Sequence, residues 1–303
     1  MLISSLLFLF AALALAGPTP GPAPSSAPAN TNIPARICGT ADPSDELKQV
    51  HGQLREAART ANLQKRATTF SHTTVETYVH LVTTFDQANK YSPSLRQTLA
   101  SNQAFVLNTA YAPANISFHM QKPSYTINDA WATDSGSTAM KSALRKGGYA
   151  ALNIYFQTNL SSTSTATTSG QTLLGYCTLP QSVIYQPPCA SGTSPCPAPI
   201  PYPSSAYAQD GCNVLLGSMP QGGVRGYQMG KTAVHEVGHW FGLLHTFQDN
   251  TCTVGDAGDY IEDTRQDATA TAGCPQGKNS CPGLKVPGAD PISNFMDYST
   301  DEW

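Results

Sequence analysis

The sequence predicts a mixed α/β fold, in which helices cover a twisted sheet. Three runs rich in branched and aromatic residues, at 75–85, 116–120 and 151–157, are typical of strands. Helical patterns fall between and after them, around 94–108 and 138–146. Strands that alternate with helices favour a mixed layer over an all-β sandwich.

The N-terminus has the features of a secretory signal peptide. Residues 1–16 are predominantly apolar and end in Ala14, Leu15 and Ala16, which fits the small-x-small rule for cleavage. The alternative is a membrane anchor, but a spanning helix needs about 20 apolar residues and this run is shorter. We therefore expect a secreted protein whose mature chain begins near Gly17.

Residues 17–66 are predicted to precede the main domain as a linker and a helical pro-segment. Prolines alternate with Gly, Ala and Ser at first, a composition too poor in apolar groups to fold. From 44 to 66, Leu47, Val50 and Leu54 recur at near-helical spacing, and Ser44 can cap the start. The main domain is then expected at 67–303.

The charge balance and the cysteines narrow the function further. The 303 residues carry a net charge of −3, so no basic excess indicates nucleic acid or an anionic membrane as partner. None of the eight cysteines forms a Cys-x-x-Cys pair, which favours disulfides in an oxidising compartment over thiolate metal sites. Asn115 and Asn159 begin sequons that can carry glycans after secretion.

The chemistry-bearing segment is "TAVHEVGHWFGLLHTF" at 232–247. In a helix, His235 and His239 present both imidazoles to one zinc ion, because residues four apart share a face. Glu236 lies beside them as a general base for a zinc-activated water. His245 can reach the same ion only if the chain turns sharply, and Gly242 can supply that turn. The alternative is a core helix with incidental histidines.

This segment resembles the metzincin zinc-peptidase signature, with Met296 in "SNFMDYS" as the methionine of the Met-turn. Together with "GDYIEDT" and "DPISNFMDYS", it resembles the pappalysin family, especially its secreted extracellular metalloproteases, from about 210 to 301. The resemblance implies zinc on the three histidines and catalysis by Glu236. It also implies that Tyr298 stabilises the tetrahedral intermediate, although a buried core tyrosine is the alternative.

The resemblance implies a metzincin-like catalytic domain, with an upper α/β part and a short irregular lower subdomain from about residue 246. The expected activity is that of a secreted, monomeric zinc endopeptidase that hydrolyses peptide bonds of extracellular proteins. Two alternatives stay open: an impaired zinc-binding protein on the same scaffold, and an amidase or other zinc hydrolase with non-protein substrates.

An acidic stretch at 256–267 suits calcium, a hard cation that prefers oxygen ligands. The resemblance places a calcium site at positions matching Asp259 and Thr264. The alternative is a solvated acidic loop.

The segment "RICG" at 36–39 resembles the Arg-x-Cys-Gly cysteine switch, in which a pro-segment thiolate fills the open zinc position. Latency through Cys38 is therefore a hypothesis, with release by cleavage near Lys65 and Arg66. The competing interpretation is a disulfide through Cys38.

The resemblance also implies a disulfide between Cys252 and Cys281. Pairs of Cys189 with Cys196 and of Cys177 with Cys212 are weaker expectations. Relatives pair the cysteine matching Cys274 with one at the position of Trp303, so we expect that pair and the C-terminal helix to be missing, or Cys274 to pair with Cys38.

Overall fold

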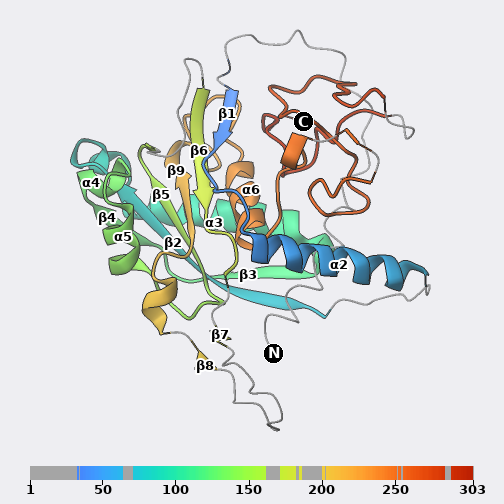
Figure 1. Ribbon diagram of the computed structural model, residues 1–303. Coiled ribbons are helices and arrows are strands. Elements are labelled where there is room, and N and C mark those ends of the chain that lie inside the picture. Colours follow the sequence, from blue (N-terminus) through green and yellow to red (C-terminus); the bar gives the residue numbers. More distant parts are fainter. Residues whose placement is uncertain are drawn as a thin grey trace.

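A computed structural model describes most of the chain (Figure 1). The described residues are 33, 35–63, 71–161, 171–181, 184–185, 200–201, 203–250, 252–253, 255–283 and 288–302. Several predictions made from the sequence lie outside them. These are the signal peptide, most of the linker, the Cys189–Cys196 pair, the cleavage site at Lys65 and Arg66, and the position of Trp303.

Seven strands form one mixed sheet in the order β1-β6-β9-β5-β2-β3, with β4 also paired to β2. In chain order they are β1 (Ala35–Cys38), β2 (Thr73–Thr83), β3 (Ile116–Met120), β4 (Ser124–Ile127), β5 (Leu152–Gln157), β6 (Gln171–Cys177) and β9 (Cys212–Leu215). A separate two-stranded ladder joins β7 (Ile184–Tyr185) to β8 (Ile200–Pro201).

The pairing within the sheet puts β6 and β1 at one end. Neighbouring strands are parallel, except that β6 runs antiparallel to β9. At that end β1 pairs with β6 in parallel, and a register irregularity falls between Ile37 and Cys38. Strand β1, at 35–38, is therefore the edge strand of the sheet, next to β6 (Figure 1).

The described part of the chain contains five α-helices. They are α2 (Asp45–Leu63), α3 (Pro93–Tyr111), α4 (Asp129–Ala132), α5 (Ser137–Leu144) and α6 (Lys231–Trp240), with short 3-10 turns η2 (Phe85–Lys90), η3 (Ala112–Ala114), η4 (Ser204–Tyr207), η5 (Leu216–Ser218) and η6 (Gln248–Asn250). None of the helices in the described part of the chain is long and apolar enough to cross a membrane.

Buried apolar clusters lie on both faces of the sheet, because successive strand side chains alternate. On β5, Ile154 and Phe156 belong to the core that α3 and α6 cover. Tyr155, between them, packs with Ala132 of α4 and Met140 of α5 on the other face. The helix that carries the histidine motif is thus built into the main core.

The structure confirms the predicted mixed α/β class, with element boundaries that shift by a few residues. The expected strand at 116–120 matches β3, and the expected helix at 44–66 becomes α2. The helix expected at 94–108 starts one residue earlier, because Ser92 accepts a hydrogen bond from the Leu95 N–H and Pro93 occupies the first helical position. The sequence analysis did not identify β1, β4, β6 or β9.

The described residues after His245 contain no strand and no helix longer than the turn η6. A disulfide between Cys252 and Cys281 joins this irregular segment to itself. Helix α2 lies alongside it (Figure 1). The His51 ring is tilted against the Tyr260 ring at 5.6 Å between centroids, and Arg59 pairs with Glu262 at 2.8 Å. The N-terminal helix is therefore docked against the C-terminal segment.

Candidate active site

Helix α6 delivers the central side chains of the site from inside the core. It begins after Gly230, whose φ of 81° suits glycine, and its nine residues from Thr232 to Trp240 are buried. His235 and His239 lie one turn apart on the helix, and both are at most 1% exposed. Such burial of two imidazoles requires partners for their ring nitrogens.

The helix ends in a sharp turn, as the sequence predicts for Gly242. This glycine has a φ of 97°, in the region that side chains disfavour. Its N–H donates to the His239 carbonyl at 2.8 Å, and the Leu243 N–H donates to the Gly238 carbonyl at 2.9 Å. The turn sends the chain back towards α6 and brings His245 beside the other two histidines.

The three imidazoles converge through their Nε2 atoms. His239 Nε2 lies 3.1 Å from both His235 Nε2 and His245 Nε2. The other ring nitrogens of His235 and His239 lie 2.7 Å and 2.8 Å from the carbonyl oxygens of Phe295 and Leu243, which fixes each Nδ1 as the protonated nitrogen. The Nε2 lone pairs therefore face one another, an arrangement that suits a shared cation.

Burial also keeps these rings neutral. It lowers the pKa of His235, His239 and His245 below the usual range, and the Arg36 guanidinium lowers each further; for His239 the value is about 4. Neutral imidazoles are the form that binds metal. The donor set thus fits a zinc ion.

The thiol of Cys38 completes the group. The ligand atoms of Cys38, His235, His239 and His245 all lie within 4.8 Å of one another. Cys38 is buried and forms no disulfide. Across the described residues, no other group of three or more histidine, cysteine or acidic side chains gathers in this way. Three nitrogens and one sulfur match the tetrahedral preference of zinc.

Glu236 lies under the same group, with no exposed surface. Burial raises the pKa of its carboxyl group to about 7, against the opposing effects of Arg36, Cys38 and Thr40. Room for the carboxylate comes from Gly175 on β6, where an added Cβ would lie 2.7–2.8 Å from three atoms of the Glu236 side chain. A glycine inside a strand often marks such a close approach, and the sequence analysis missed it.

Tyr298 and Met296 approach the histidines from the C-terminal segment. The Tyr298 ring lies 5.0 Å from the His245 ring, and its hydroxyl accepts a hydrogen bond from the Cys38 N–H at 3.2 Å. Burial raises the pKa of that hydroxyl. Met296 lies under α6, so close that a Cβ on Gly238 would be 2.5 Å from its sulfur.

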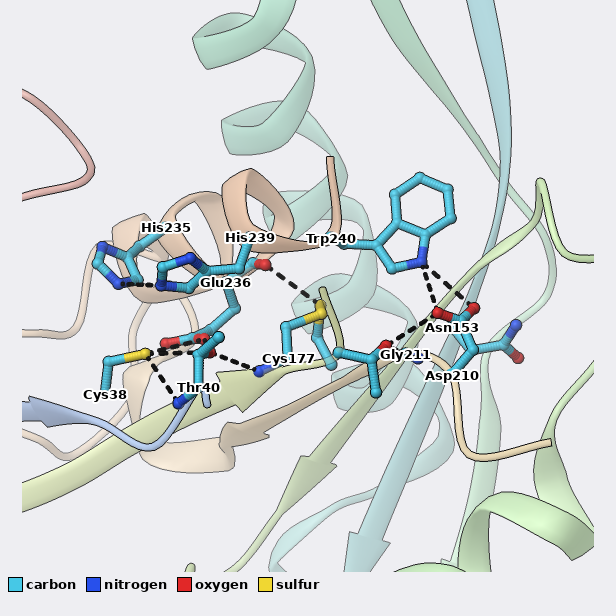
Figure 2. The surroundings of a disulfide bond; sticks show 12 residues. Cys38, Thr40, Asn153, Cys177, Asp210, Gly211, His235, Glu236, His239 and Trp240 are labelled. Atoms are coloured by element: carbon cyan, nitrogen blue, oxygen red, sulfur yellow. Dashed lines mark hydrogen bonds between the residues drawn. A yellow bond between two sulfur atoms is a disulfide. The ribbon is translucent and has the colours of Figure 1, made fainter. Parts of the chain in front are cut away.

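Figure 2 shows how α6 is fixed to the sheet. A disulfide joins Cys177 of β6 to Cys212 of β9, and the Cys212 sulfur lies 3.4 Å from the main-chain oxygen of Glu236. At the end of the helix, the Trp240 indole donates to Asp210 at 3.1 Å. The helix, the two strands and the loop before β9 thus form one unit.

The acidic stretch predicted to bind calcium lies beside helix α2. Asp259 is buried, and burial raises the pKa of its carboxyl group to about 7, while Thr264 lies in the same loop. Together, α2 and this loop line a cavity of about 400 Å³. Its walls include Arg55 of α2 and Glu262 of the loop. In the described part of the chain, no three carboxylates of this loop gather closely enough to form a metal-binding group.

The two sequon asparagines, Asn115 and Asn159, are both exposed. Asn115 adopts a φ of 58° in the turn before β3, and Asn159 follows β5. The structure therefore leaves both side chains accessible.

The chain is similar to known metalloproteases. A model of the peptidase M43 family, described as pregnancy-associated plasma protein-A, matches residues 190–302. An extracellular metalloprotease of Aspergillus fumigatus is 37% identical over 285 residues, covering 88% of this chain and 82% of that protein. Similar proteins from Pyricularia oryzae and Coccidioides posadasii are 40% and 38% identical, with 87% and 91% of this chain covered and 81% and 86% of theirs.

Solved structures support the fold. A promirolysin mutant from Tannerella forsythia matches with a TM-score of 0.54 and 20% identity over 88% of each chain. Mirolysin in complex with a small compound matches with a TM-score of 0.51 and 21% identity, covering 76% of this chain and 85% of that one.

Proposed function

The chain belongs to the peptidase M43 family and is a metalloendopeptidase, and from that premise we propose that it is secreted as a latent zinc enzyme that cleaves extracellular proteins. The observation that carries the proposal is the convergence of three imidazole Nε2 atoms beside a buried carboxylate. The relatives named extracellular metalloproteases support secretion, as does the apolar run at 1–16 of the sequence.

His235, His239 and His245 would hold the zinc ion. When bound, zinc supplies Lewis acidity that lowers the pKa of a water molecule and polarises the scissile carbonyl. The hydrogen bonds from Nδ1 of His235 and His239 to main-chain carbonyls support this assignment, because they set the tautomer that a metal ligand needs.

Glu236 acts as the general base and then as the general acid. Its carboxylate accepts a proton from the attacking water and passes it to the leaving amine. Burial of Glu236 raises the pKa of its carboxyl group, which favours uptake of that proton. The Tyr298 hydroxyl is available as a donor to the developing oxyanion once the Cys38 N–H is no longer beside it.

We propose that the described chain is the latent form. Cys38 lies with the three histidines and would serve as a fourth ligand, which excludes the attacking water. Burial, with the nearby Glu236 carboxylate, raises the pKa of the free thiol, and a bound cation would oppose this and favour the thiolate. Cleavage between α2 and β2, followed by departure of the segment up to residue 66, would leave a catalytic domain at 67–303.

We also propose one calcium site and two glycosylation sites. Asp259 and Thr264 would contribute oxygen ligands to calcium in the cavity beside α2, and titration calorimetry with Asp259→Asn checks this. Asn115 and Asn159, both exposed, would carry glycans, which an endoglycosidase shift in apparent mass would reveal.

The decisive experiment compares hydrolysis of casein by the processed chain and its variants. The wild type is expected to lose activity with a zinc chelator and to regain it when zinc is restored. Glu236→Ala should abolish turnover and still bind one zinc ion per chain, whereas the exposed Glu76→Ala serves as the matched control. Full zinc content with no hydrolysis in the wild type would favour an inactive zinc-binding protein. Turnover retained in Glu236→Ala would refute the mechanism.

A further inference from the structure

The carboxylate of Glu236 is contacted by three side chains of the N-terminal segment. An Arg36 guanidinium nitrogen lies 3.7 Å from Oε1. Oε2 accepts from the Cys38 thiol at 3.5 Å and from the Thr40 hydroxyl at 3.4 Å. These residues are two positions apart, a spacing that puts side chains on the same side of an extended chain. One face of the segment is therefore directed at the catalytic carboxylate as well as at the histidines.

The Arg36–Glu236 pair is buried. The two side chains are 3% and 0% exposed, and the Arg36 guanidinium also lies 5.5 Å from the centre of the Tyr298 ring. Removing one member of such a pair leaves the other charge buried without compensation. Arg36 therefore ties the segment to the domain by a contact that does not involve the metal ligands.

Thr40 connects three groups at once. Its hydroxyl donates to Glu236 and accepts from the main-chain N–H of Cys177 on β6 at 2.9 Å. Its own N–H lies 3.4 Å from the Cys38 sulfur, to which it donates. A hydroxyl has one proton and two lone pairs, so these roles are compatible. Thr40 thus positions the thiol and covers a strand N–H near the catalytic carboxylate.

We propose that Arg36 and Thr40 are positioning residues of the latent state, which hold the segment in the site through Glu236 independently of any bond between Cys38 and the metal. This inference rests on the proposed function, since it takes Glu236 as the general base and Cys38 as the inhibitory thiol. It predicts that latency has two parts. The first part is the bond between Cys38 and the metal. The second is the contact of Arg36 and Thr40 with the Glu236 carboxylate, which persists when the metal is removed.

The test measures how fast iodoacetamide alkylates Cys38 in the full chain, followed by mass spectrometry of the peptide that contains it. The chain is kept in chelator, so no metal protects the thiol. Arg36→Ala and Thr40→Val should each speed the alkylation of Cys38 by about tenfold, because a hydrogen bond or ion pair to a charged group is lost. Lys48→Ala is the matched control, since it removes a cation from the same segment.

A double-variant cycle separates capture of the carboxylate from general loosening of the fold. In a Glu236→Gln background, Arg36→Ala should add little to the alkylation rate, since its ionic partner is already gone. Arg36→Lys should restore part of the protection, and Thr40→Ser most of it. The proposal is overturned if Arg36→Ala and Thr40→Val behave like Lys48→Ala, or if the effect of Arg36→Ala is unchanged in the Glu236→Gln background.

The two proposals can fail separately. Alkylation in chelator reports on the segment alone, whereas casein hydrolysis by the processed chain reports on the enzyme. A third measurement is the peptidase activity of the full-length Cys38→Ser variant loaded with zinc. This variant should stay partly latent, and the Cys38→Ser, Arg36→Ala double variant should be several-fold more active than Cys38→Ser. Equal activity of these two would contradict the second part of latency.

Discussion

Substituting Gly175 by alanine tests whether the position of Glu236 limits catalysis. Gly175 lies in β6, opposite the Glu236 carboxylate, and it pairs with Cys38 of β1 and Val214 of β9. A Cβ at this position would lie 2.7 Å from Glu236 Cγ, 2.8 Å from Cδ and 2.8 Å from Oε1. The alanine keeps the backbone N–H and C=O, so the strand pairing is preserved.

The clash sets the size of the expected effect. Ordinary carbon contacts begin near 3.4 Å, so the Glu236 side chain must move by about 0.7 Å to relieve a contact of 2.7 Å. A misplacement of about 1 Å at a reacting group can reduce the rate by about a hundredfold. We therefore expect kcat/KM to fall by about 10- to 100-fold, which corresponds to roughly 1.4–2.7 kcal/mol of transition-state stabilisation.

The assay uses the processed enzyme with a fluorogenic peptide, together with zinc content and thermal melting. Gly148→Ala is the control, because a Cβ there has no heavy atom within 4 Å. We expect the Gly175 variant to bind zinc normally and to lose mainly kcat. If it retains full kcat while Gly148→Ala also behaves as wild type, the carboxylate does not need its present position and the reasoning fails.

Three further predictions concern the packing around the site and the docked N-terminal helix. Gly238→Ala would bring a Cβ to 2.5 Å from the Met296 sulfur, so circular dichroism melting should show a loss of about 1–3 kcal/mol of stability; an unchanged melting temperature would contradict this. Glu262→Gln removes the ionic partner of Arg55 and Arg59, so limited proteolysis should cut α2 several-fold faster, and an unchanged rate would argue against the contact. Burial lowers the pKa of His51 below 6.5, so the folded protein favours its neutral form. The free energy of unfolding should therefore fall as the pH drops below 6.5 towards the pKa of His51 in the folded state. His51→Gln should reduce that dependence in melts at pH 5 and 7.5.

The parts of the molecule that follow from local pattern were predictable. The strand at 116–120 and the helix at 94–108 have the composition and periodicity of their elements, and the structure has β3 and α3 there. The turn at Gly242 follows from chain geometry, because a straight helix cannot bring His245 back to His239. These inferences need only neighbours within about ten residues.

The parts that depend on distant pairing were not predictable. Nothing local in the four residues of β1 shows that they pair with β6, more than 130 positions away, or that Arg36 meets Glu236. A four-residue segment becomes a strand mainly because it pairs with an existing sheet edge, so its own composition predicts it poorly. The resemblance of residues 36–39 to a cysteine switch had placed Cys38 near the zinc ligands, and Gly175 offered a second clue, as a glycine inside the apolar run of β6.

The acidic stretch shows a different limit of sequence reasoning. Its density of carboxylates suits calcium, yet composition does not say whether the oxygens converge. In the structure Glu262 turns to Arg59 of α2 instead, and Asp267 accepts from Thr246 and Ser280. Calcium binding at Asp259 and Thr264 therefore stays a prediction.

The position of β1 at the end of the sheet has a consequence for the protein after maturation. While β1 is in place, the outer backbone groups of β6 are hydrogen-bonded within the molecule. Its proposed departure would turn β6 into an open edge, and such edges can pair with strands of other chains, including other copies of the same protein. If β1 leaves with the N-terminal segment, as proposed, the step that uncovers the histidines would also leave this edge of the sheet open to other chains.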